Sequence, residues 1–224
     1  MAVFGSIPIG TLNAQLTTND RSFNKAVREA IVAKYRNMFK NAEAPIKNRI
    51  TPIFAKAITN TNIVQELLSN GPLMGHLGLE DAGDLVDIIL QWTLNEIIVK
   101  STLVRSVGDK IQGHIYVGMI YADYQDVFQN PSASFESEHG FKIPWLPWLI
   151  DSAGVDAYTI EYGIKFGEGL GRTGQAVMIK NARQPWTLPF QYLGSPEDNF
   201  VTQALDSIED QVLEIMIQEI EKQI

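Results

Sequence analysis

The segment from 141 to 179, FKIPWLPWLIDSAGVDAYTIEYGIKFGEGLGRTGQAVMI, constrains the fold of this chain more than any other stretch. It begins with two Trp beside two Pro and continues into a stretch that alternates apolar and polar residues, then a Gly-rich loop, then a second apolar stretch. Because Pro fits the first turn of a helix but not its interior, the aromatic part predicts a short helix over 145–150. The rest predicts a β-hairpin with a flexible tip that uses Gly to reach positive φ.

Helical patterns dominate the first hundred residues. From position 19 or 20, where Asn or Asp can cap a helix, apolar residues recur at helical spacing as far as position 58. Pro45 and Pro52 fall inside this pattern, which therefore predicts either two helices or one long bent helix. A short helix over 60–71 and another over 81–95 follow.

The apolar period changes to two between 96 and 122, around Gly108-Asp109-Lys110, which predicts another β-hairpin. Near the end of the chain, Ser195 followed by Pro196 predicts the start of a long amphipathic helix. We therefore expect an α+β fold with N-terminal helices, a small twisted antiparallel sheet of two hairpins and a long C-terminal amphipathic helix. The expected organisation is an extended arm over 1–19 and a single α+β domain over 20–224.

Charge is distributed unevenly along the 224 residues, whose formal net charge is −8. This acidic balance lacks the electrostatic footprint of a nucleic-acid binder. Basic residues gather near the start of the chain and acidic residues near its end. Two interpretations remain open: solvated helix faces, or a basic face of one copy that meets the acidic face of the next.

The chain contains no Cys, so it has no disulfide and no thiolate chemistry. No apolar run is long enough to span a membrane, and no secretory signal pattern is present, so we expect a product made in the cytoplasm. The arm over 1–19 either packs on its own domain or reaches a neighbouring subunit.

None of the chemical sites that the residues could form is favoured. Gly169, Gly171 and Gly174 match G-x-G-x-x-G, but a strand pattern follows them, whereas a dinucleotide site needs a helix there. The three His lack a metal-binding spacing. Asp123 and Asp126 could form an acidic pair, but a polar helix face is far commoner. We therefore predict no catalytic residue, no cofactor and no metal, and expect that the chain is not an enzyme.

The same residues offer surfaces for protein contacts. Trp145 and Trp148 lie on one face of the short helix and serve either as core residues or as interface anchors. At the hairpin tip, Arg172 and Thr173 offer hydrogen bonds to a neighbour. The candidate interface residues are Trp145, Trp148, Gly169, Gly171, Arg172, Thr173 and Trp186.

A set of motifs resembles structural proteins of tailed-bacteriophage virions, specifically neck components of the head–tail joining or tail-completion type. These motifs are IKNRITPIFAKAI over 46–58, NEIIVKS over 95–101, PWLPWLIDSAG over 144–154, GRTGQAVM over 171–178, PWTLPFQYLG over 185–194 and NFVTQAL over 199–205. They consist of packing residues, so they indicate a family of building blocks.

The resemblance implies a virion structural protein, assembled in the host cytoplasm. It implies a homo-oligomeric ring of six or twelve copies at the head–tail interface, bound to portal or adaptor and tail proteins. DNA would pass through without sequence-specific binding, and no membrane would be involved. The alternatives are a tail or baseplate subunit and, from a different class, a small hydrolase-like enzyme using Asp123, Asp126 and His139.

Overall fold

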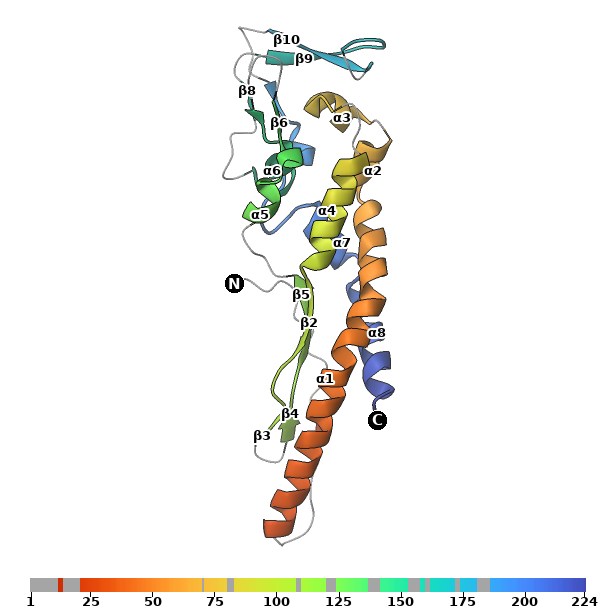
Figure 1. Cartoon of the computed structure of the whole chain (residues 1–224), viewed down its shortest axis with the longest axis vertical. Helices are drawn as coiled ribbons and strands as arrows, with labels where there is room; N and C mark the ends of the chain where they lie inside the picture. The colour runs from red at the N-terminus through yellow and green to blue at the C-terminus, as the bar shows by residue number, and fades with distance from the viewer. Residues whose placement is uncertain are drawn as a thin grey trace. The chain divides into compact units, whose positions relative to one another are not determined.

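The computed structural model describes residues 12–13, 21–69, 71–79, 83–107, 110–119, 124–136, 142–152, 158–159, 162–171, 174–180 and 186–224. Over these ranges the chain has the predicted α+β fold (Figure 1). It divides into two compact units: unit 1 contains Met1–Ile53, Glu96–Tyr121 and Ile208–Ile224, and unit 2 contains Phe54–Asn95 and Ala122–Ser207. The expectation of a single domain over 20–224 stays a prediction.

The first helix, α1 (Arg21–Thr59), is one continuous helix of 39 residues that contains both Pro45 and Pro52. At about 1.5 Å per residue it is about 58 Å long. Each Pro removes one backbone hydrogen bond and crowds the preceding turn. Ile46 and Ile50 lie between them at 0% and 2% exposure, so burial of the apolar face stabilises the helix through both interruptions.

The hairpin that the sequence predicted between 96 and 122 is present and belongs to unit 1. Strand β2 (Ile97–Ser101) pairs antiparallel with β5 (Ile115–Met119), and β3 (Arg105–Val107) pairs with β4 (Lys110–Gln112). Strand β4 also pairs with β1 (Leu12–Asn13), while the other residues of the predicted arm lie outside the described ranges. The hairpin approaches α1 at Gly113, where a Cβ would lie 2.9 Å from the ring of Phe39. The same Cβ would lie 2.8 Å from Val104 Cγ2, so a larger residue here would displace the neighbouring side chains.

Unit 2 contains short helices and short antiparallel strand pairs, and its largest buried side chains include Phe54, Trp145, Trp148 and Phe200. Its described helices are the second part of α1, α2 (Asn62–Leu68), α3 (Pro72–Leu77), α4 (Gly83–Asn95), α5 (Gln125–Phe128), η1 (Pro131–Ala133), α6 (Trp145–Ile150), η3 (Phe190–Tyr192) and α7 (Phe200–Asp206). Its described strands are β6 (Phe135–Glu136), β7 (Lys142–Ile143), β8 (Tyr158–Thr159), β9 (Tyr162–Phe166), β10 (Ala176–Lys180) and β11 (Trp186–Thr187).

The two predicted hairpins do not share a sheet in the described part of the chain. The β2–β5 pair belongs to unit 1, whereas β9–β10 belongs to unit 2 and pairs in its own two-stranded sheet. Each hairpin packs on helices of its own unit, and this local packing takes the place of the single small sheet that we expected.

The predicted long C-terminal helix is divided into α7 and α8 (Glu209–Glu221). Its start also differs from the prediction. The Ser195 hydroxyl accepts a hydrogen bond from Asp198 N at 3.0 Å in a turn, and the helix is capped instead by Asn199, which accepts from Val201 N and Thr202 N. After α7, the Ser207 hydroxyl donates to Ala204 O at 2.7 Å, a local bond that competes with helix continuation.

Candidate protein-docking surfaces

The β9–β10 hairpin is held against α3 by its inner face. Phe166 is opposite Ala176 across the strand pair, so their side chains share one face of the hairpin. A Cβ placed on Gly75 of α3 would lie 3.0 Å from the Phe166 ring and 3.4 Å from Ala176 Cβ. The absence of a side chain at Gly75 therefore lets the helix and the hairpin approach closely.

The opposite, outer face of the hairpin is partly apolar and exposed. Ile179 is opposite Gly163, and Val177 is opposite Lys165. Because Gly163 has no side chain to cover its cross-strand neighbour, Ile179 keeps 43% of its surface exposed. Unit 2 also exposes Phe166 to 47%, on the inner face of the hairpin, and Phe190 to 88%, within η3. Exposed large apolar residues of this kind are typical of protein contact sites when they gather on one surface.

In the described part of the loop that joins β9 to β10, the prediction of positive φ at Gly is confirmed. Gly169, Gly171 and Gly174 have φ of 73°, 65° and 71°. The loop is closed by hydrogen bonds from Gly167 N to Gln175 O at 2.8 Å and from Gly169 N to Gly174 O at 2.7 Å. The two candidate contact residues at its tip, Arg172 and Thr173, lie outside the described residues.

The two Trp of α6 are core residues. Trp145 is 1% exposed and its indole N–H donates to Ser132 O at 2.8 Å, while Trp148 is 2% exposed. Every residue of α6 is buried. This corrects the assignment of Trp145 and Trp148 as interface residues, because almost no side-chain surface remains for a partner. Trp186 lies in β11 opposite Thr159, and its side chain is not among the described ones.

The acidic alternative for an enzyme falls on residues outside the described ranges. Asp123 and His139 lie outside them, as does the side chain of Asp126 in α5. Among the described residues no group of three or more His, Asp or Glu side chains is arranged to hold a metal ion.

A titratable cluster in unit 2 joins α2, α3 and η3. One oxygen of Glu66 accepts hydrogen bonds from the Tyr192 hydroxyl at 2.7 Å and from Leu73 N at 3.1 Å. Burial and the bond to Glu66 raise the pKa of Tyr192. The His76 ring lies 6.1 Å from the Tyr192 ring and 4.8 Å from the Phe166 ring, and burial lowers the pKa of His76 against the opposing charge of Glu66. These contacts connect α2, α3 and η3, and α3 is the helix against which the β9–β10 hairpin packs.

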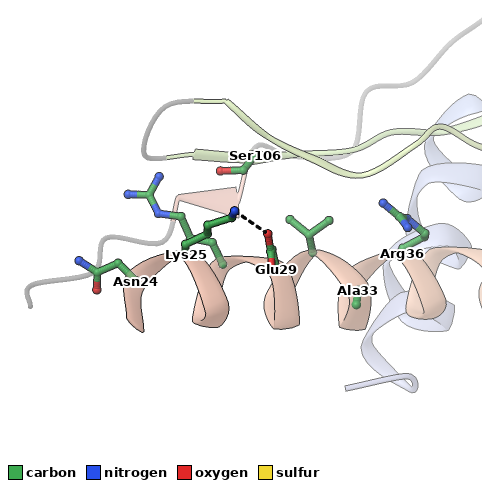
Figure 2. Close-up of a pocket in the computed structure, with 8 residues that line it drawn as sticks. Asn24, Lys25, Glu29, Ala33, Arg36 and Ser106 are labelled. Atoms are coloured by element: carbon green, nitrogen blue, oxygen red, sulfur yellow. Dashed lines mark ion pairs between the residues drawn. The ribbon is translucent and has the colours of Figure 1, made fainter. Parts of the chain in front are cut away.

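Unit 1 carries a basic hollow between the first turns of α1 and strand β3, with a volume of about 680 Å³ (Figure 2). Ser106 faces it from the strand side and a row of α1 side chains faces it from below. We define the basic hollow by its lining residues, Asn24, Lys25, Arg28, Glu29, Val32, Ala33, Arg36 and Ser106. Lys25 and Glu29 are 3.9 Å apart, with 76% and 70% of their side chains exposed, a pair that contributes little to stability.

Ion pairs and hydrogen bonds at two places connect α1 to other elements of unit 1. Arg49 donates to Glu219 of α8 at 2.7 Å, and Lys222 donates to the same carboxylate at 2.6 Å. The hydrogen bonds from Lys222 and Arg49 lower the pKa of Glu219. Nearer the hairpin, Glu43 accepts from Ser101 N at 2.8 Å and from Ser101 Oγ at 2.6 Å.

No protein family, curated protein or solved structure matches this chain. No described helix is long and apolar enough to span a bilayer.

The sequence had indicated the hairpin tip, but it did not indicate the exposed outer face at Ile179 or the basic hollow. Alternation alone does not say which face a helix covers, and the hollow depends on residues of α1 and β3 that are distant in sequence.

Proposed function

We propose that this chain is a structural subunit of a tailed-phage virion neck. Copies of it would form a ring at the head–tail interface and join the portal or its adaptor to the tail around the DNA channel. The motif resemblance supports this proposal, as does the formal charge of −8, which suits a channel that DNA must pass without adhering. The proposed location is the virion, after assembly in the host cytoplasm.

The observation that carries the proposal is the outer face of the β9–β10 hairpin. Ile179 is 43% exposed beside Val177, on a hairpin that α3 supports from the other side. Backbone hydrogen bonds from Gly167 and Gly169 join the described residues at the two ends of the Gly-rich loop, which lowers the conformational entropy that these residues would lose when a partner binds. An apolar face on a hairpin that a helix supports from the opposite side is suited to docking on another protein.

The native mass of the purified chain, across a concentration series, tests self-association first. The second measurement mixes the chain with purified portal and tail proteins of the same virus and follows complex formation by light scattering. A ring, or a complex with both proteins, is expected. Binding to the tail protein alone would instead indicate a tail or baseplate subunit. A chain that stays monomeric and binds neither protein would contradict the proposal.

A matched pair of variants connects this test to the hairpin. Ile179→Gln removes an aliphatic side chain that is 43% exposed, and Leu68→Gln removes one that is 46% exposed at the end of α2. Docking through the outer face should make Ile179→Gln cost about 1 kcal/mol of binding free energy, or roughly a fivefold loss of affinity. Leu68→Gln should leave the affinity unchanged. Equal effects of the two changes would exclude the hairpin as the docking face.

A further inference from the structure

We infer that the basic hollow of one copy binds the acidic face of α8 of a second copy. The inference rests on the proposed self-assembly and specifies which two surfaces form the contact between copies. Its starting point is the charge of the hollow, whose described lining contains Lys25, Arg28 and Arg36 together with one acid, Glu29. Val32 and Ala33 supply an apolar floor between these charges. The hollow is therefore suited to an anionic surface that also carries an apolar side chain.

The exposed face of α8 has this composition. Asp210, Glu214, Ile217 and Glu221 are all exposed, and their spacing of four, three and four residues places them on one side of the helix. Ile217 keeps 41% of its surface exposed between the acids. We call these four residues the acidic stripe. The opposite side of α8 is buried through Val212, Ile215, Met216 and Glu219, so the stripe is the face left for a partner.

The two surfaces match in length, and three of their four positions match in order. Lys25 and Arg36 span about 16 Å of α1, and Asp210 and Glu221 span the same length of α8. When the helices are set parallel, Lys25 is opposite Asp210 and Arg36 is opposite Glu221. In the same register Val32 is opposite Ile217, because each follows the first residue of its set by seven positions. The parallel alignment thus places opposite charges at both ends and one apolar pair between them. It also places Glu214 opposite Glu29, which lies 3.9 Å from Lys25 in its own copy.

A copy cannot fill its own hollow with its own stripe. The bonds from Arg49 to Glu219 at 2.7 Å and to Gln218 at 2.9 Å fix α8 beside α1 near position 49. Arg36 lies about 20 Å from Arg49 along α1, and Lys25 lies farther still. The stripe must therefore come from a neighbour. Because the two surfaces differ, the contact is heterologous and repeats from copy to copy until a ring closes.

Charge reversal tests this contact. Lys25→Glu with Arg36→Glu reverses the hollow, and Asp210→Lys with Glu221→Lys reverses the stripe. The matched control, Lys34→Glu with Lys56→Glu, makes the same charge change on exposed residues of α1 outside the hollow. Native mass is measured for each variant across a concentration series, and circular dichroism checks that each remains folded. Each reversed protein should self-associate at least about tenfold more weakly than the wild type, and the control should be unchanged.

Mixing sharpens the test. The hollow-reversed copy keeps its acidic stripe, which fits the unchanged hollow of the stripe-reversed copy. The reversed stripe and the reversed hollow also carry opposite charges, so an equimolar mixture should assemble, with the two variants alternating, although neither variant assembles alone. The chain with all four changes should regain the wild-type assembly. If both reversed variants form the same oligomers as the wild type, this inference is wrong, while the proposed function is unaffected. A hollow reversal that lowers DNA binding but leaves assembly intact would also overturn the inference. A wild-type chain that stays monomeric and binds neither portal nor tail protein would overturn the proposed function as well.

Discussion

Replacing Gly171 by Ala should destabilise the β9–β10 tip much more than the same change at Gly169. The two residues have φ of 65° and 73°, a region where a side chain costs about 1–2 kcal/mol. They differ in the space around them. A Cβ on Gly171 would lie 2.0 Å from Ala176 O, whereas a Cβ on Gly169 would have no atom within 4 Å.

The expected free energies follow from this difference. The contact between a Cβ introduced at position 171 and the carbonyl oxygen of Ala176 involves backbone, so it is relieved only if the two ends of the loop move apart. That movement breaks the hydrogen bonds that Gly167 and Gly169 donate across the loop, each contributing about 1 kcal/mol net. Together with about 1 kcal/mol for positive φ, Gly171→Ala should cost about 3 kcal/mol, against about 1 kcal/mol for Gly169→Ala.

Amide hydrogen exchange, followed by mass spectrometry of peptides that cover β9 and β10, measures the local opening free energy directly. Gly174→Ala is a second control, since Gly174 has φ of 71° and open space around it. It should lose the same protection as Gly169→Ala. Equal losses in all three variants would refute the steric part of the reasoning, because the backbone conformation alone would then account for the effect.

Three further changes test the supporting structure. Tyr192→Phe removes the bond to the Glu66 carboxylate and should lower the free energy of unfolding in urea by about 1–2 kcal/mol, whereas an unchanged midpoint would contradict this contact. Asn199→Ala removes a buried helix cap and its bond to Ser195 O at 2.9 Å, so the same assay should show a loss of about 2–3 kcal/mol, and a loss below about 0.5 kcal/mol would contradict the capping role. Partial burial raises the pKa of Glu43, but hydrogen bonds from Lys40 and Ser101 outweigh it and hold the pKa below 4.5. Its contribution to stability is therefore present above about pH 4.5 and lost as the pH falls further. The free energy of unfolding of Glu43→Gln should then decrease less steeply with falling pH than that of the wild type. The same pH dependence in both proteins would contradict this role of Glu43.

Local patterns predicted the elements that depend on neighbouring residues. The hairpin over 96–122 follows from a period of two, and the positive φ of Gly169 and Gly171 follows from the loop composition. The C-terminal helix shows the limit of such patterns. Ser195-Pro196 has the residues of a helix start, yet the helix is capped by Asn199, whose side chain also donates to Ile150 O at 3.4 Å in another element. That tertiary contact has no signature near Asn199.

The sites depended even more on contacts between distant segments. The sequence left Trp145 and Trp148 with two interpretations, and only the packing around α6 assigns them to the core. The bond between Tyr192 and Glu66 joins residues 126 positions apart, so no spacing rule could find it. The basic residues were visible in the sequence, but the hollow they line forms only where β3 lies over α1.

Ionic strength should separate the two docking surfaces. Contact through the basic hollow depends on charge, and screening shortens the Debye length from about 14 Å at about 0.05 M salt to about 4 Å at about 0.5 M. Contact through the outer face at Ile179 depends on apolar burial, which salt does not weaken. If the hollow joins copies, the native mass should therefore be lower at the higher salt concentration than at the lower one. Binding of portal or tail protein through the hairpin should be equally strong at both. If self-association were equally strong at both concentrations, apolar burial would be the dominant force between copies, and the charge match between α1 and α8 would have no role in assembly.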